Sequence, residues 1–334
     1  LLAPLRGLAT RFGVGPTMRS MLAAAKTHGI PCALPDAEDD DAFQFGFGGR
    51  KRRVRATITG RASRGVAAGR GDAGSMRRFL AALFPGGADG RIPLVAITGT
   101  NGKTTTTLLI DRMFRAAGFT TGVAASTGVY VDGRCIEEGD CTGYWSARKV
   151  LGSRKVEAAI LETARGGILK RGLGFDRCDV AVVLNVTGDH LGLDGVDTVE
   201  EMARVKRVVA RASRRAVVLN AEDAHCVAMA ARVRRGVEVV YFSLDQGNAV
   251  LQTHLAEGGR AVYLCQGDAI LATGTDRRVF FRVDDLAVAL RGRARHNVAN
   301  VLAAVAAAVA QGQCPDEAII SGMQGFRCST AQNP

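Results

Sequence analysis

The chain has 334 residues, a length sufficient for two domains or for one large domain with appendages. Hydrophobic residues make up 47% of it, which is ample for a packed core, and aromatic residues make up 5%. It contains no run of about 18 or more apolar residues, so the sequence predicts no membrane-spanning helix. The formal net charge of +12 comes mainly from arginine. Such a charge favours polyanions as partners, namely nucleic acid, nucleotide phosphates or an acidic polymer. The alternative is an arginine-rich composition spread over a solvated surface.

The eight cysteines are scattered along the chain, with no C-x-x-C pair. This spacing favours neither a metal site nor a disulfide framework, and reduced thiols are typical of a cytoplasmic protein. The chain begins at Leu1 without the pattern of a signal peptide, and its last residues read as a loop. We therefore expect a fragment of a longer, cytoplasmic polypeptide.

The first 90 residues carry weaker patterns. A Gly-Pro-Thr sequence predicts the start of a helix over 18–26. Hydrophobic residues then alternate with polar ones over 53–59, which predicts one strand of a hairpin. A nucleic-acid-binding arm is the alternative for this basic stretch, but the aromatic residues of 43–47 precede the charges instead of lying among them. Residues 60–76, rich in Gly, Ala and Arg, indicate a weakly structured connector.

From Arg91 onward, short apolar runs alternate with helical patterns. The apolar runs predict strands at 94–97, 158–161, 180–186, 216–219 and 237–242. The patterns between them predict helices at 104–117, 199–212 and 221–233. Strands of this length separated by helices indicate βαβ units and an α/β fold with a mostly parallel sheet. A more antiparallel region is expected around 249–290, followed by a buried helix over 297–310.

A glycine-rich segment joins the first of these strands to the first helix. Glycines at this place let backbone N–H groups approach phosphate oxygens, and the helix N-terminus adds partial positive charge. Lys103 supplies a charge for the outer phosphates, and the Thr104 hydroxyl can ligate Mg²⁺. The general phosphate-loop pattern has a glycine five residues before Gly102, where this chain has Ile97, so the loop is a variant. A glycine-rich turn without a ligand is the alternative, but such turns rarely place Lys-Thr at the start of a helix.

The residues that end the other strands are informative, because ligands gather at the carboxyl ends of strands in open parallel sheets. Glu162 ends one expected strand, Asn185 ends the next, and His190 lies just beyond it. We therefore expect Thr104, Glu162 and His190 to meet at one rim as a hard-metal site beside ATP phosphates. Taken singly, Glu162 could be a surface carboxylate and His190 a capping or core histidine.

Lys206 falls on the apolar side of the expected helix 199–212, four residues after Met202 and three before Val209. A lysine there either extends its ammonium to the surface or serves a site. Burial lowers the pKa of a lysine and exposes a neutral amine. Such an amine could take up CO₂ and become a carbamate that ligates a metal.

The chain resembles the Mur ligase superfamily, and within it the C-terminal, Mur-type half of cyanophycin synthetases. The resemblance covers about residues 91–313, and it is specific because several motifs agree in order and spacing. These motifs lie at 98–106, 139–143, 162–169, 185–192, 203–206, 218–223 and 295–300. Folylpolyglutamate synthetases have a similar loop but fit 140–143 and 162–169 less well.

The resemblance implies a role for each matching residue. ATP is bound by the loop residues Gly99, Thr100, Asn101, Gly102, Lys103, Thr104 and Thr105 and, at the adenine, by His296, Asn297 and Asn300. Mg²⁺ ligands are Thr104, Glu162, His190 and, if carbamylated, Lys206; the catalytic residues are Lys103, Glu162, His190 and Lys206. The residues expected to contact the substrate are Asp140, Thr142 and Arg165.

The implied chemistry is ATP-driven formation of an amide bond. A substrate carboxylate attacks the γ-phosphate to give an acyl phosphate, which an amine then attacks. The implied cofactors are ATP and Mg²⁺, and the implied partners are an amino acid, arginine first, and an acidic peptide or polymer whose aspartate side chains accept it. The sequence leaves open whether the chain forms a homo-oligomer, and it favours neither a membrane nor a nucleic acid as a partner.

The expected organisation has four parts. These are an ATP-grasp-like remnant at 1–72, a linker at 73–90, the Mur-type central domain at 91–313 and the start of a C-terminal Mur domain at 314–334. The body of the ATP-grasp region and the rest of the C-terminal domain are not recognised. Three alternatives therefore stay open: a non-catalytic nucleotide- or polymer-binding remnant, a P-loop NTPase or kinase, and another Mur-type ligase related to folylpolyglutamate synthetases.

Overall fold

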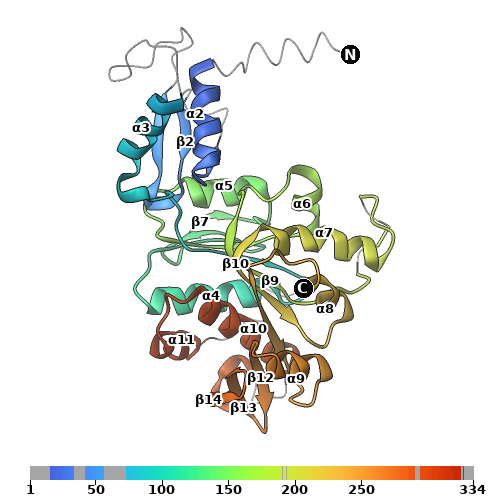
Figure 1. Ribbon diagram of the computed structural model, residues 1–334. Helices are drawn as coiled ribbons and strands as arrows, with labels where there is room; N and C mark the ends of the chain where they lie inside the picture. Colours follow the sequence, from blue (N-terminus) through green and yellow to red (C-terminus); the bar gives the residue numbers. More distant parts are fainter. Residues whose placement is uncertain are drawn as a thin grey trace. The chain divides into compact units, whose positions relative to one another are not determined.

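The computed structural model describes residues 16–33, 42–55, 73–189, 191–192, 194–289, 294–324 and 326. The chain divides into two compact units, Leu1–Ile92 and Pro93–Pro334 (Figure 1). Across the described ranges, no helix combines the length and the apolar character that crossing a bilayer requires.

The first unit is a small α+β structure. Its elements are α2 (Pro16–Thr27), β1 (Cys32–Ala33), β2 (Ala42–Phe45), η1 (Gly48–Arg50), β3 (Arg52–Arg55), α3 (Ala73–Leu83) and η2 (Pro85–Gly87). The three strands form an antiparallel sheet in the order β1-β2-β3. The hairpin predicted around the basic stretch is therefore present, although residues 56–59 of the expected strand lie outside the described residues.

Helix α3 lies within the range expected to be a linker. Its residues Met76 and Leu80 are one helical turn apart, so they share one face, and both are buried together with Phe84. They pack with Met21 of α2 and Phe45 of β2 in one hydrophobic cluster. Apolar residues at this spacing explain why the segment forms a helix of the first unit.

The second unit is built on an eleven-stranded sheet. Its strands are β4 (Leu94–Thr98), β5 (Thr121–Ala125), β6 (Gly128–Val131), β7 (Arg134–Glu138), β8 (Ala158–Glu162), β9 (Cys178–Val183), β10 (Ser213–Asn220), β11 (Glu238–Ser243), β12 (Arg260–Cys265), β13 (Asp268–Thr273) and β14 (Asp276–Arg282). They lie in the order β14-β13-β12-β11-β10-β9-β4-β8-β5-β6-β7. The pairs from β12 to β5 are parallel, and the pairs towards both edges are antiparallel. The predicted α/β fold with a mostly parallel sheet is confirmed.

Helices cover both faces of this sheet. They are α4 (Lys103–Ala116), α5 (Tyr144–Gly152), α6 (Arg165–Arg171), α7 (Val199–Ala212), α8 (Ala224–Ala230), α9 (Ala249–Ala256), α10 (Arg295–Gln311) and α11 (Asp316–Met323), with the short turns η3 (Val283–Asp285) and η4 (Ala287–Ala289). Adjacent residues of one strand serve opposite layers, since Val182 belongs to the hydrophobic cluster that includes α4, α10 and α11, while Val183 belongs to the cluster that includes α7, α8 and α9.

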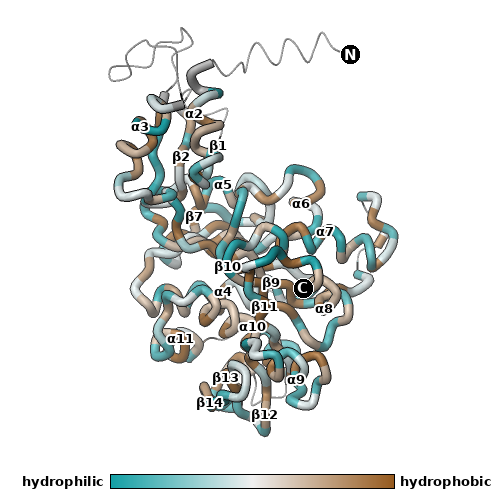
Figure 2. Tube along the Cα trace, viewed as in Figure 1, coloured by the Kyte–Doolittle hydropathy of each residue, from teal (hydrophilic) through white to brown (hydrophobic). Residues whose placement is uncertain are grey.

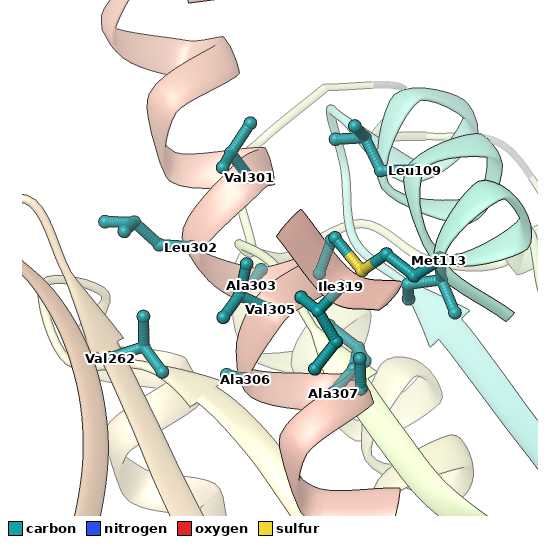
Figure 3. Close-up of a cluster of buried hydrophobic side chains, with 14 of the residues drawn as sticks. Leu109, Met113, Val262, Val301, Leu302, Ala303, Val305, Ala306, Ala307 and Ile319 are labelled. Atoms are coloured by element: carbon teal, nitrogen blue, oxygen red, sulfur yellow. The ribbon is translucent and has the colours of Figure 1, made fainter. Parts of the chain in front are cut away.

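The core of the first layer is centred on α10, in which 11 of the 17 residues are Ala or Val and 12 are buried. Figure 3 shows side chains of α10 beside Leu109 and Met113 of α4, Ile319 of α11 and Val262 of β12. The hydrophobic segments in Figure 2 follow the same central strands and helices. The prediction of a buried helix over 297–310 is confirmed, and its small side chains let it lie close to the sheet.

Candidate nucleotide-binding site

The phosphate loop lies between the carboxyl end of β4 and the first residue of α4. Gly102 has a φ of 84°, in the left-handed region that favours glycine. A Cβ at this position would lie only 2.1 Å from Oδ1 of Asn300, which belongs to α10. Asn300 is itself buried, so the loop fits against α10 only because residue 102 lacks a side chain.

Asn185, just after β9, holds the loop from the other side. Its Oδ1 accepts hydrogen bonds from the backbone N–H of Thr100 at 3.0 Å and of Asn101 at 2.9 Å. Its Nδ2 donates to the carbonyl of Asn101 at 3.1 Å. One amide side chain thus fixes two consecutive peptide groups of the loop. This asparagine was noted as a strand end in the sequence, but its clamping role was not predicted.

Lys103 begins α4 and bends back over the loop, where its Nζ donates to the carbonyl of Thr100 at 2.7 Å. Burial lowers the pKa of the Lys103 ammonium, and the carboxylates of Glu162 and Asp140 oppose that shift. Lys103 therefore lies within electrostatic reach of both carboxylates.

Glu162 ends β8 opposite Ile97 of β4 and is only 3% exposed. Its Oε2 accepts a hydrogen bond from Oγ1 of Thr104 at 3.0 Å and from the backbone N–H of Ser126 at 3.1 Å. The hydroxyls of Thr104 and Ser126 are 2.8 Å apart. Burial raises the pKa of Glu162, against the pull of these hydrogen bonds and of Lys103. Ser126 follows β5, and the sequence does not predict its role, because a lone serine carries no motif.

The expectation that Thr104 and Glu162 lie at one rim is confirmed. His190, the third member of that set, lies outside the described residues. Its neighbour Asp189 reaches the loop, since its Oδ2 accepts from Nδ2 of Asn101 at 3.2 Å. Within the described ranges, no three His, Cys, Asp or Glu residues gather closely enough to hold a metal ion by themselves.

Lys206 is buried on α7, with 3% of its surface exposed. Burial, reinforced by the positive charge of Lys103, lowers its pKa from 10.5 to about 7. The helix starts at a capping box in which Thr198 and Glu201 satisfy each other's backbone N–H groups. The first alternative for Lys206, an ammonium extended to solvent, is therefore wrong, while the carbamate stays a prediction.

The three residues predicted to handle substrate lie near the start of α5 and α6. Asp140 Oδ1 accepts from the Thr142 hydroxyl at 2.7 Å. The carbonyl of Thr142 accepts from the backbone N–H of Ala164 at 3.3 Å, so this turn lies against the end of β8. Arg165, the first residue of α6, forms an ion pair with Asp194 at 3.6 Å. Their contacts with a substrate stay a prediction.

The remaining predicted ATP contacts lie at the start of α10 and of α4. His296 is exposed, and Nδ2 of Asn297 donates to the carbonyl of Val288 at 3.0 Å. Thr105 lies in the first turn of α4 and is partly buried. Of the α10 residues expected at the adenine, the structure brings Asn300 against the phosphate loop.

A second missed residue is Asp223, which links the strand end at Asn185 to α8. Its Oδ2 accepts from the backbone N–H of Val186 at 2.7 Å, and its Oδ1 accepts from that of Cys226 at 2.9 Å. The same carboxylate therefore caps α8 and holds the residue that follows the Asn185 clamp. An aspartate before a helix predicts a cap, but only the fold shows its second partner.

The glycine loop, the strand-end glutamate and the buried sheet define a P-loop α/β domain. The family model for the Mur ligase middle domain matches residues 97–308. Cyanophycin synthetase from Synechocystis sp. is 43% identical over 254 residues, which cover 75% of this chain and 29% of that protein. UDP-N-acetylmuramoylalanine–D-glutamate ligase from Rhizobium etli is 34% identical over 70% of this chain and 43% of its own length. The chain belongs to the Mur ligase family, through its middle domain.

The fold is also similar to that of a solved Mur ligase structure. The solved structure of UDP-N-acetylmuramoyl-L-alanyl-D-glutamate–2,6-diaminopimelate ligase superimposes with a TM-score of 0.56 at 21% identity, over 76% of this chain and 50% of that one. The chain spans less than a third of the cyanophycin synthetases that it matches and less than half of the glutamate ligases.

Proposed function

We propose that this chain carries the ATP-binding core of a carboxylate–amine ligase that forms an amide bond through an acyl phosphate. The observation that carries the proposal is the meeting of Thr104, Ser126 and Glu162 beside Lys103, at the end of a phosphate loop in a Mur ligase middle domain. Two relatives that the chain matches in sequence are named as a synthetase and as a ligase.

ATP and a divalent cation are the cofactors expected for this family, and the residues present fit both. The glycine-rich loop leads into the N-terminus of α4, where backbone N–H groups can meet phosphate oxygens, and Gly102 takes the left-handed backbone conformation that this turn needs. Hydroxyl and carboxylate oxygens, as on Thr104 and Glu162, are the ligands that Mg²⁺ prefers. We assign one Mg²⁺ to Thr104 and the phosphates, and another to Glu162, His190 and a carbamylated Lys206; both ions would neutralise charge on the phosphates.

The chain's own residues then act mainly by position and charge. Lys103 is placed to leave the Thr100 carbonyl and neutralise charge that develops on the transferred phosphoryl group. Asn185 keeps the loop amides in place, so little reorganisation is needed when phosphate oxygens arrive. The burial of Glu162 keeps competing water away from its carboxylate.

For the substrates we propose arginine, or a related amino acid, and the aspartate side chains of a cyanophycin-like polymer. The 43% identity with a cyanophycin synthetase and the net charge of +12 both support an acidic acceptor. Asp140, Thr142 and Arg165 lie at the turn against the end of β8, where such substrates would meet the phosphoryl group. We expect the reaction to take place in the cytoplasm.

The test uses the protein at its full natural length, with ATP, Mg²⁺, arginine and a poly-aspartate primer. Phosphate release is expected to require both arginine and primer, and labelled arginine should enter the polymer. Lys103→Ala, which removes the loop charge, is the control and should abolish both signals. Phosphate release without either substrate would indicate an NTPase, and incorporation unaffected by Lys103→Ala would exclude this site as the ligase centre.

A further inference from the structure

Six arginines gather at the end of the sheet opposite the phosphate loop. The loop follows the carboxyl end of β4, and β9, β10 and β11 run parallel to that strand, so their amino ends lie at the other rim. The six precede or begin β10 and β11, and all are exposed. This group, the arginine collar, consists of Arg211, Arg214, Arg215, Arg232, Arg234 and Arg235.

Backbone contacts hold the collar together. Nη2 of Arg234 donates to the carbonyl of Ser213 at 3.1 Å, which joins the turn before β11 to the start of β10. Nη1 of Arg177, just before β9, donates to the carbonyl of Arg211 at 3.0 Å. These two hydrogen bonds connect the end of α7 and the starts of three neighbouring strands, which carry the collar.

A β-bulge presents two of these arginines at once. Ser213 pairs with Cys178 and Ala216 pairs with Val180, so β10 has one more residue than β9 over this stretch. A regular strand would turn Arg214 and Arg215 to opposite faces of the sheet, one of them towards each helical layer. The bulge leaves both exposed at the rim.

Few acidic groups balance the collar. Asp179 is bonded to it through its Oδ1 and Nε of Arg214 at 2.7 Å, and its Oδ2 already accepts from the backbone N–H of Leu94. Next to the collar, Asp176 and Arg177 cancel in formal charge. Glu238, the first residue of β11, likewise cancels Arg260, with which it forms an ion pair. The six arginines and Asp179 then leave a formal charge of +5.

Structural roles account for only part of this charge. Arg215 lies against Gly312, which ends α10, and there it meets the partial negative charge of the helix C-terminus. Arg234 donates to a carbonyl, which carries no compensating charge. Among the residues that the structure describes, Arg211, Arg232 and Arg235 form no ion pair. Like charges so close together repel one another, which favours an anionic partner from outside.

We propose that the arginine collar binds an acidic polypeptide and so anchors the acceptor polymer away from the phosphate loop. The identity of the polymer rests on the proposed function. Guanidinium groups match carboxylates in shape and can bind them through two parallel hydrogen bonds. The collar segments 209–216 and 231–238 contain no aromatic residue on which bases would stack, which disfavours single-stranded nucleic acid.

The test measures binding alone, without ATP or amino acid, so it is independent of ligase activity. Fluorescent poly-L-aspartate is titrated with the wild-type protein and with Arg211→Gln/Arg232→Gln/Arg235→Gln, three collar residues without ion pairs. The matched control makes the same charge change at exposed arginines outside the collar, Arg134→Gln/Arg204→Gln/Arg277→Gln. Binding of an ATP analogue, which needs only the opposite rim, reports that each variant is folded.

We expect the collar variant to lose roughly tenfold or more in affinity at 0.1 M salt and to show a shallower salt dependence, because fewer counterions are released. The control variant should stay close to the wild type. Equal losses in both variants would show that only net charge matters and would overturn the proposal. Tighter binding of an oligothymidylate of equal charge, also lost in the collar variant, would overturn it in favour of a nucleic acid partner.

Discussion

At the scale of single residues, the site is governed by burial of charged groups. Burial shifts the pKa of Lys103 down and that of Glu162 up, so both are driven towards their neutral forms while each favours the charge of the other. The loop between them is held by amide side chains, which carry no charge of their own. Phosphates and a cation would therefore enter a site whose geometry is fixed and whose charges are incompletely balanced.

Asn185→Ala removes three hydrogen bonds to the phosphate loop. We expect roughly tenfold weaker binding of an ATP analogue by calorimetry, because the loop amides must then be ordered when the nucleotide binds. Asn248→Ala is the control, since that asparagine caps α9 through the backbone N–H of Leu251 and has no contact with the loop. Equal affinities of both variants would show that Asn185 does not organise the site.

Lys206 gives a prediction about pH. Its pKa is about 7 in the folded chain, whereas the ordinary value is 10.5, so the unfolded state binds more protons between these values. The free energy of unfolding contributed by this residue should therefore rise as pH increases from about 7 to 10. In CO₂-free buffer, Lys206→Met should lack that rise in denaturant titrations. Parallel pH profiles would contradict the lowered pKa.

The carbamate that the family resemblance implies has its own signature. A neutral, buried amine reacts with CO₂, so ¹³C-labelled bicarbonate should produce a carbamate carbonyl signal in the NMR spectrum of the wild type. The signal should be absent from Lys206→Ala, and ligase turnover should fall both in that variant and on removal of bicarbonate. Full turnover without bicarbonate would argue against the carbamate.

At the scale of elements, close helix contacts shape the layer behind the loop. Gly322 of α11 lies so near α4 that a Cβ there would stand 2.6 Å from the Cα of Met113. The clash is with backbone, which cannot rotate away as a side chain would. Helix α4 begins with Lys103 and Thr104, so the packing of α11 supports the helix that carries the site.

Gly322→Ala should therefore force α11 away from α4. We expect a loss of about 1–3 kcal/mol in the free energy of unfolding, because the added methyl group overpacks a buried contact. Ser321→Ala, on the exposed side of the same helix, should change it by less than about 0.5 kcal/mol. Thermal unfolding of both variants checks this, and similar midpoints would mean that the helices can separate without cost.

Elements with strong periodicity were predictable from the sequence, and those set by local caps were not. The expected helix over 199–212 has the same bounds as α7, whose apolar stripe is pronounced and whose start is fixed by a capping box. Helix α9 lies inside a region expected to be antiparallel strands. Asn248 caps the start of α9, where its Oδ1 accepts a hydrogen bond from the backbone N–H of Leu251. Asparagine is as common in turns as at the start of a helix, so the sequence alone does not distinguish this helix start from a loop.

The site was predictable in its parts but not in its connections. The phosphate loop, Glu162 and the buried Lys206 follow from motif, strand end and helical stripe. Ser126 and the Asn185 clamp depend on which strands become neighbours, since β5, β8, β4 and β9 lie side by side only in the folded sheet. Sequence spacing does not contain that order, so contacts across strands emerged only with the fold.

At the scale of the whole molecule, two groups of charged residues lie at opposite ends of the parallel strands. One rim holds the phosphate loop with the half-buried Lys103 and the buried Glu162, and the other holds the arginine collar. A polymer anchored at the collar would leave its free end to reach the loop, and the high local concentration would favour repeated additions. The same domain would then combine phosphoryl transfer with retention of the acceptor.

The central claim is that a substrate carboxylate is activated as an acyl phosphate at this loop. The most direct measurement gives the full-length protein a poly-aspartate acceptor labelled with ¹⁸O in its side-chain carboxylates, together with ATP, Mg²⁺ and arginine. Attack of a carboxylate oxygen on the γ-phosphorus and later loss of phosphate should transfer one ¹⁸O to each phosphate released per amide formed. Amide formation with no ¹⁸O in the phosphate would contradict this account.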